Sequence, residues 1–200
     1  MNNGAMHKIS YGLYILTARE NGRDNGCVIN TLAQVTTTPN RVSIAVNKQN
    51  YTHDMIHRTG KFNASVLTTE TDFSVFKHFG FQSGRDIEKF AENAVMPRSE
   101  NGIIYLPGFT CAYISGSVSS EIDLGSHTMF IADVTDCDVL SDGEPLTYAY
   151  YHKSIKPKPQ PTQKKGYRCK ICGYVYEGDE LPPDFICPIC KHGAADFEKI

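Results

Sequence analysis

The chain has 200 residues, of which 40% are hydrophobic and 21% charged. That length suits one or two domains, and the composition excludes collagen-like, coiled-coil and wholly disordered chains. The formal net charge of −2 argues against nucleic acid as a partner, because phosphate binding needs a surplus of basic residues. No run approaches about 18 apolar residues and the start, MNNGAMHKIS, lacks the apolar core of a signal peptide, so we expect a cytoplasmic protein with no membrane partner.

The first 152 residues contain short runs of alternating polarity separated by turn residues, a pattern typical of a closed or split β-barrel. Strands are expected, in chain order, at 11–18, 26–31, 42–46, 62–67, 110–118, 128–140 and 146–150. Short helices are expected at 53–59, 72–79 and 84–91, the first two closed by Gly60 and Gly80. No strand is followed by G-x-G-x-x-G, so a Rossmann dinucleotide domain is not indicated.

The stretch from residue 25 to residue 56 is dense in neutral polar side chains, which suit the polar rim of a heterocycle and a sugar-like chain. These side chains are Asn30, Thr31, Gln34, Thr36 and Thr37. The following NKQNYT loop, 47–52, brings Lys48 and side-chain amides to the expected start of a helix, where free N–H groups attract phosphate. An ordinary loop capped by Thr52 explains the same residues, and the loop alone leaves both interpretations open.

Residues 153–165, KSIKPKPQPTQKK, form a different kind of segment. They hold five lysines, no acidic residue and a proline at every second position from 157 to 161. Such a segment has too little apolar surface to fold and prefers extended conformations. We therefore expect a linker between a domain at 1–152 and a second domain at 166–200. For its first half, an ordered strap along the first domain is the alternative.

Four of the seven cysteines lie within 22 residues of the second domain, as two C-x-x-C pairs separated by 14 residues. Nothing signals secretion, so the pairs indicate a metal site and not disulfides. Two facing C-x-x-C turns create a tetrahedron of thiolates, which suits iron or zinc. The expected ligands are Cys169, Cys172, Cys187 and Cys190. Structural zinc ribbons use the same spacing, which leaves the choice of metal open.

The residues around the cysteines narrow that choice. The pattern Y-x-C-x-x-C-G-Y-x-Y, then C-P-x-C and a later F-E, resembles rubredoxin over the whole tail, which implies one iron that carries single electrons. Five aromatic residues in so short a domain would surround one side of the metal and build a core too small to stand without it. Rubredoxins usually have Gly after the fourth cysteine, where this chain has Lys191. A left-handed turn at lysine costs about 1–2 kcal/mol.

The stretch 25–56, together with FGFQSGRDIEKF at 79–90 and GSHTMFIADV at 125–134, resembles the flavin reductase family of FMN-binding split barrels. The resemblance implies isoalloxazine and ribityl contacts for Asn30, Thr31 and Thr36. It implies phosphate contacts for Lys48, Asn50 and Thr52, and Gln34 and Asn47 complete the expected cofactor set. The family's G-D-H-T motif, whose histidine faces the nicotinamide cofactor or the flavin, reads GSHT here, so His127 is the expected catalytic residue. The resemblance also implies a homodimer with flavin near the interface.

As a whole the chain resembles the high-molecular-weight rubredoxins, a family of anaerobes that fuses these two domains. The resemblance implies a mainly β protein: an FMN-binding split β-barrel with a few short helices and a small rubredoxin-like metal-knuckle domain. The implied function is NAD(P)H-dependent electron transfer through FMN and the iron centre to an external acceptor, with a flavodiiron oxygen or nitric oxide reductase as the candidate. The alternative is a flavin reductase or flavin-binding protein with a structural zinc-ribbon tail.

Overall fold

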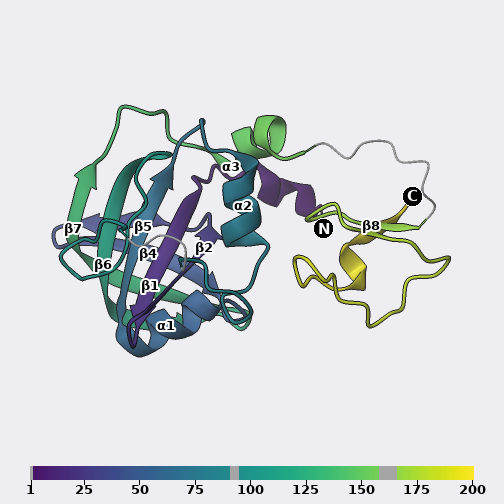
Figure 1. Ribbon diagram of the computed structural model, residues 1–200, viewed down its shortest axis with the longest axis horizontal. Coiled ribbons are helices and arrows are strands. Elements are labelled where there is room, and N and C mark those ends of the chain that lie inside the picture. The colour runs from purple at the N-terminus through teal and green to yellow at the C-terminus, as the bar shows by residue number, and fades with distance from the viewer. Residues whose placement is uncertain (1, 91–94, 158–165) are drawn as a thin grey trace.

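The computed structural model describes residues 2–90, 95–157 and 166–200, which form a barrel-like body and a smaller C-terminal domain (Figure 1). The body holds a seven-stranded antiparallel sheet in the order β2-β1-β5-β6-β7-β4-β3. Its strands are β1 (Tyr14–Glu20), β2 (Arg23–Ile29), β3 (Ala33–Thr37), β4 (Asn40–Asn47), β5 (Lys61–Leu67), β6 (Thr110–Asp123) and β7 (His127–Val139). The mainly β architecture expected from the sequence is confirmed.

The core of the body follows from the alternation in its strands. In β4 every second side chain, from Val42 through Ile44 to Val46, is buried. Helix α1 (Tyr51–Thr59) adds Met55 and Ile56 to the same core and ends at Gly60, whose φ of 67° is the left-handed conformation that glycine adopts without strain. In Figure 1 this helix crosses one end of the barrel.

A second glycine is required by close packing. A Cβ added at Gly116 on β6 would lie 2.4 Å from the fully buried ring of Phe62 on β5, so only glycine lets the two strands pack over that ring. Helix α2 (Phe73–Gly80) begins after Asp72, whose carboxylate accepts the N–H of Ser74 at 2.8 Å. Its buried residues Phe76 and Phe79 belong to a second core cluster at the side of the barrel.

Two expected elements are wrong. Residues 146–150 do not form a strand: helix α3 (Tyr148–Tyr150) and the π-helical turn η2 (Tyr151–Ile155) stand there, because the Thr147 hydroxyl accepts the N–H of Tyr150 and starts a helix. Residues 84–90 of the expected helix at 84–91 form turns, and Lys89 points inward to backbone carbonyls; Ala91 lies outside the described residues. Strand β3 and the short N-terminal 3-10 helix η1 (Asn3–Lys8) were not expected from the sequence.

The C-terminal domain is built around its cysteines. Its small sheet has the order β10-β8-β9, with β8 (Tyr167–Cys169), β9 (Val175–Tyr176) and β10 (Phe197–Lys199), and η3 (Ala194–Asp196) precedes the last strand. Cys169, Cys187 and Phe197 are buried at its centre. The first residues of the expected linker belong to the barrel. They form part of η2, which the bond from Lys156 N–H to Tyr151 C=O closes, and residues 158–165 lie outside the described residues. No helix among the described residues is long and apolar enough to cross a membrane.

Candidate functional site

The two C-x-x-C segments fold as a matched pair of turns. The N–H of Gly173 donates to Cys169 C=O at 2.9 Å, and the N–H of Lys191 donates to Cys187 C=O at the same distance. Each turn is completed by a residue with positive φ, 80° at Gly173 and 61° at Lys191. The left-handed lysine expected from the sequence is therefore confirmed, and the second turn keeps its shape despite it.

The four sulfur atoms, which all lie within 4.8 Å of one another, form a compact group. Cys169 Sγ is 3.5 Å from Cys190 Sγ, and Cys172 Sγ is 3.4 Å from Cys187 Sγ. A metal bound to four thiolates at about 2.3 Å would hold its sulfurs about 3.8 Å apart, so this group fits one tetrahedral ion. The four ligands expected from the sequence are brought together.

An aromatic shell surrounds this metal site. Phe185 packs edge-on to Phe197 at 5.3 Å between ring centroids and lies 4.8 Å from Tyr176, and Tyr167 and Tyr174 complete the cluster. Burial raises the pKa of the Cys172 thiol to about 11, so an incoming metal must displace a proton from it. Metal binding here releases protons and weakens as the pH falls.

Replacing Lys191 with glycine is expected to stabilise the metal-loaded C-terminal domain by about 0.5–1 kcal/mol. The change removes the cost of a left-handed lysine, about 1–2 kcal/mol, and part of that gain is offset because glycine has more freedom in the unfolded chain. Denaturant unfolding, followed by the metal–thiolate absorption, measures the difference. Gly173→Lys is the matched reverse change in the first turn and is expected to destabilise the domain; equal stabilities for all three proteins would contradict this explanation.

The barrel carries a cavity of about 460 Å³ beside the start of α1, within the size range of ligand pockets. We call it the helix-start cavity. Three segments far apart in the sequence supply its barrel side: 25–28 from β2, 47 and 49–52 around the helix start, and residues between 79 and 89, from the end of α2 onward. The first N–H groups of a helix have no partner within the helix, and the helix dipole makes that end attractive to an anion.

Asn25 on β2 is the clearest sign of a ligand in this cavity. Its side chain is 2% exposed and its Nδ2 donates to the hydroxyl of Thr52 at 2.9 Å, while its Oδ1 is buried without a hydrogen-bond partner in the part of the chain that the structure describes. A Cβ at Gly84 would lie 2.1 Å from that oxygen, so glycine lets the 79–89 segment approach. An unpaired buried acceptor is costly, and a donor group on a ligand in the cavity would satisfy it.

Lys89 adds a buried positive charge to the same cavity. It is 4% exposed, and its Nζ donates to Gly26 C=O at 2.8 Å and to Phe79 C=O at 3.0 Å. Burial lowers the pKa of Lys89 to about 8, which leaves most of the side chain charged at neutral pH. An ammonium group with two carbonyl partners has one further N–H to donate.

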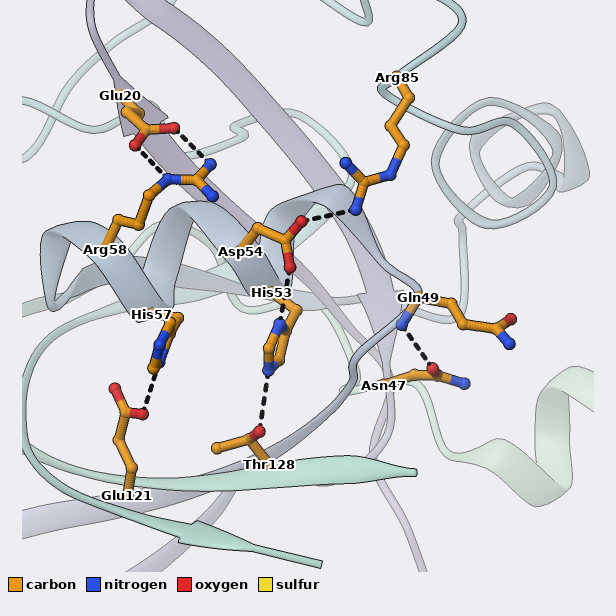
Figure 2. Close-up of polar contacts among 10 residues, drawn as sticks. All are labelled: Glu20, Asn47, Gln49, His53, Asp54, His57, Arg58, Arg85, Glu121 and Thr128. Atoms are coloured by element: carbon orange, nitrogen blue, oxygen red, sulfur yellow. Dashed lines mark hydrogen bonds and ion pairs between the residues drawn. The ribbon is translucent and has the colours of Figure 1, made fainter. Parts of the chain in front are cut away.

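Polar contacts hold the loop before α1 and the first turn of that helix (Figure 2). Asn47 Oδ1 accepts the N–H of Gln49 at 2.9 Å, and Asp54 Oδ2 accepts from Arg85 at 2.6 Å. The guanidinium groups of Arg23 and Arg85 each lie 5.1 Å from the ring centre of Tyr51, the first residue of the helix. Arg23 therefore adds positive charge near the end of α1 that already favours anions, whereas the charge of Arg85 is balanced by Asp54.

The expected cofactor residues divide into two groups. Asn47, Asn50 and Thr52 line the helix-start cavity. The remaining five do not line it: Asn30, Thr31, Gln34, Thr36 and Lys48.

Four of these five residues have a contact or a register position elsewhere. The Thr31 hydroxyl donates to Ala45 C=O at 2.7 Å, Gln34 bonds Asn40, and Thr36 pairs with Arg41 in the β3–β4 register. Lys48 forms an ion pair of 2.7 Å with the exposed Asp123, and such surface pairs contribute only about 0–1 kcal/mol. Lys48 can therefore exchange that partner for a ligand at low cost.

His127, the expected catalytic residue, stands at the first position of β7. It pairs in register with Asn47 at the end of β4, and its Nδ1 lies 2.9 Å from the hydroxyl of Ser126. The next residue, Thr128, is buried and bonds His53 Nε2 at 2.8 Å, which anchors β7 to α1 (Figure 2). His127 is thus next to the loop that leads into the cavity, although it does not line the cavity itself.

Asn25, Lys89 and Arg85 line the cavity but are not among the residues expected from the sequence. All three lie within the two segments that resemble flavin reductases, 25–56 and 79–90. The sequence hinted at them only by placing two basic residues, Arg85 and Lys89, in a turn-rich segment that follows a helix. Their role depends on the tertiary fold, since Lys89 bonds a carbonyl 63 positions earlier in the chain.

Comparisons with known proteins agree with this geometry. Residues 6–157 match the flavin reductase like domain family, and residues 167–198 match the rubrerythrin, rubredoxin-like domain. The chain is 41% identical to a high molecular weight rubredoxin of Moorella thermoacetica over the full length of both proteins. It is 38% identical to a ferric-chelate reductase (NAD(P)H) of Archaeoglobus fulgidus, covering 81% of this chain and 95% of that one.

Solved structures support the fold of the barrel. The NADH:FAD oxidoreductase of Streptomyces globisporus superposes with a TM-score of 0.64 at 20% identity, over 72% of this chain and 84% of that one. An FMN-binding protein from Thermus thermophilus gives 0.63 at 19% identity, over 72% and 82%. With its flavin reductase-like barrel and four-cysteine domain, the chain belongs to the high molecular weight rubredoxins and is an oxidoreductase whose cofactors are a flavin and iron.

Proposed function

We propose that the protein takes reducing equivalents from NADH or NADPH, passes them through FMN in the barrel to iron in the C-terminal domain, and delivers them to an external redox protein. The observation that carries this proposal is that one cavity is lined by both domains: Thr52 and Lys89 from the barrel and Cys190 from the metal site. A flavin exchanges electrons in pairs or singly, whereas an iron–thiolate centre exchanges one, so the two cofactors connect a hydride donor to a one-electron acceptor.

FMN, with a single phosphate, fits the positive groups at the helix start. The N–H groups of α1 and the Lys89 ammonium offer an anion site, and Arg85 lies beside it in an ion pair with Asp54. In this proposal Asn47, Lys48, Asn50 and Thr52 hold the phosphate end. The ring and ribityl contacts of Asn30, Thr31, Gln34 and Thr36 remain part of the proposal, as does a role for His127 toward the nicotinamide or the flavin.

A homodimer is also proposed, because the barrel exposes an apolar surface at β3, an edge strand of the sheet. A cavity of about 350 Å³ there is lined mainly by apolar side chains, among them Leu32, Val42 and Ile114. Val35 on β3 is 51% exposed and Val139 at the end of β7 is 72% exposed. A second chain would cover this surface and the free edge of β3.

The acceptor is proposed to be a protein, with a flavodiiron oxygen or nitric oxide reductase as the first candidate. Support comes from the chain's similarity to putative diflavin flavoproteins, one of them from Thermosynechococcus vestitus at 28% identity over 74% of this chain. This chain spans only 26% of that protein, so the likeness concerns one part of it.

Anaerobic addition of NADH or NADPH to protein reconstituted with FMN and iron tests the function. Both the flavin absorption and the thiolate-to-iron absorption are expected to bleach. Protein that holds iron but no flavin is the control and is expected to keep its iron oxidised, because no residue of the chain accepts a hydride. Reduction of iron at the same rate without flavin, or bleaching of the flavin alone, would contradict the proposal.

A further inference from the structure

The C-terminal domain meets the barrel through its metal-bearing edge. Ile171 of the first C-x-x-C turn, and Ile189, Cys190, Lys191 and His192 of the second, lie close to the barrel. All five line the helix-start cavity, opposite the start of α1 and the 79–89 segment. We call these five residues the knuckle edge. Figure 1 shows the small domain beside the α2 side of the barrel.

A second cavity, of about 480 Å³, lies along the same contact. Both domains line it. The barrel contributes Phe73, Phe81, His152 and Lys156, and the C-terminal domain contributes Arg168, Cys169, Lys170, Cys172, Gly173 and Glu198. The two metal ligands that are partly exposed are therefore both at the contact: Cys190 lines the first cavity and Cys172 the second, whereas Cys169 and Cys187 are buried. The side of the metal site with the thinnest protein cover faces the barrel.

A direct hydrogen bond links the two domains. Lys156 Nζ, at the end of the barrel segment, donates to Ile171 C=O at 2.6 Å. Ile171 lies between the ligands Cys169 and Cys172, so the bond attaches the barrel to the first metal turn itself. Ile171 and Ile189 each remain 39% exposed with the two domains in contact, so the contact covers them only in part.

The connection between the domains restricts the reach of the C-terminal domain. Eight residues, 158–165, separate Pro157 from Gly166, and a chain of that length spans at most about 30 Å. A short tether gives the attached domain a high effective concentration at its own barrel. Contact within one chain is therefore favoured over contact between chains.

We infer that the C-terminal domain docks on the barrel of its own chain, with the knuckle edge over the helix-start cavity, so that the iron of each chain serves the flavin of the same chain. The role of the flavin in this statement rests on the proposed function. The docking itself is independent of it, because the contact is made by side chains and backbone of the two domains.

Paramagnetic broadening tests the docking in the full chain with flavin bound. Ferric iron broadens the signals of nearby amides, and zinc, held by the same four thiolates, is the diamagnetic reference. In ¹⁵N-labelled iron-loaded protein, the amides of Asn50, Gly84 and Lys89 are expected to lose intensity relative to the zinc form. The amides of the first half of β6, on the side of the barrel away from the small domain in Figure 1, are expected to keep it.

Variants on each side of the contact show whether this broadening comes from docking. Ile189→Glu is expected to restore the cavity signals, whereas Ile186→Glu is not, because Ile186 is 61% exposed on the same domain but does not line the helix-start cavity. Lys156→Gln changes only the barrel side, with Lys153→Gln as its control, so weakened broadening in Lys156→Gln cannot arise from a misfolded metal turn. Retained thiolate-to-iron absorption verifies the metal site of every variant.

A mixed sample separates docking within a chain from docking between chains. Labelled zinc-loaded chains are mixed with excess unlabelled iron-loaded chains, and mass spectrometry verifies subunit exchange. Docking within a chain predicts that the labelled cavity amides keep their intensity; broadening there, or no broadening in the labelled iron-loaded protein, would overturn the inference. If docking is seen and NAD(P)H leaves the iron oxidised, the proposed function fails while the docking stands.

Discussion

Cys172→Ser is expected to abolish stoichiometric iron binding and to unfold most of the C-terminal domain. The domain has only three buried hydrophobic residues at its centre, two of which are themselves cysteines of the metal site. A core of that size does not offset the entropy of ordering the chain, so the metal supplies the missing free energy. Metal analysis and the thiolate-to-iron absorption measure the loss, and proteolysis of the tail reports its unfolding.

The matched control is Cys137→Ser. Cys137 is an exposed free cysteine on β7 and is not among the four clustered thiols. This variant is expected to keep its iron, its flavin and an intact tail. A Cys172→Ser protein with one tightly bound iron and a protease-resistant tail would show that the metal site has been placed wrongly.

Asn25→Leu is expected to weaken flavin binding by about 10- to 100-fold and to lower the stability of the flavin-free protein by only about 1 kcal/mol, because the lost bond to Thr52 is partly offset by removal of the unpaired oxygen. The change removes an acceptor that is buried without a partner, and losing a hydrogen bond to a ligand in such a site costs about 1–3 kcal/mol. Leucine has a similar volume and removes the unpaired oxygen, but it also removes the amide that donates to the buried Thr52 hydroxyl. Flavin fluorescence titration measures the affinity, and denaturant unfolding without flavin measures the stability.

Ser115→Ala is the matched control for Asn25→Leu. The Ser115 hydroxyl is the other buried side-chain atom without a partner among the described residues, but it lies on β6 and does not line the helix-start cavity. Its replacement is expected to leave flavin affinity unchanged. If both variants bind flavin as the parent does, Asn25 makes no contact with the cofactor.

The sequence predicts most where the determinants are local. The spacing of Cys169, Cys172, Cys187 and Cys190 specifies the metal site, and the left-handed Lys191 follows from the geometry of one turn. The alternation in β4 and the glycine after α1 were equally readable. At 146–150 the alternation misled, because the Thr147 cap and the packing of Tyr151 on Phe76, 4.4 Å apart between ring centroids, favour a helix there.

The helix-start cavity was only partly predictable, for a physical reason. The loop at the helix start is local, so the sequence could point to Asn50 and Thr52, which line the cavity, but Asn25 joins them only through its bond to Thr52, 27 positions away. Lys89 likewise reaches the cavity because the segment after α2 folds back onto β2. Contacts between distant segments depend on the tertiary packing, which periodicity and spacing do not encode.

The most direct test of the account is single-turnover reduction by NAD(P)H, with flavin and iron followed separately in the intact chain and in a severed pair. The cut is placed after Pro157, because η2 and Lys156 belong to the ordered barrel side. The intact chain is expected to reduce its iron at a rate independent of protein concentration. The severed pair at micromolar concentration is expected to be slower by a factor on the order of 100 or more, since the effective concentration of the tethered domain is lost. Equal rates for the intact chain and the severed pair would contradict electron transfer within the chain.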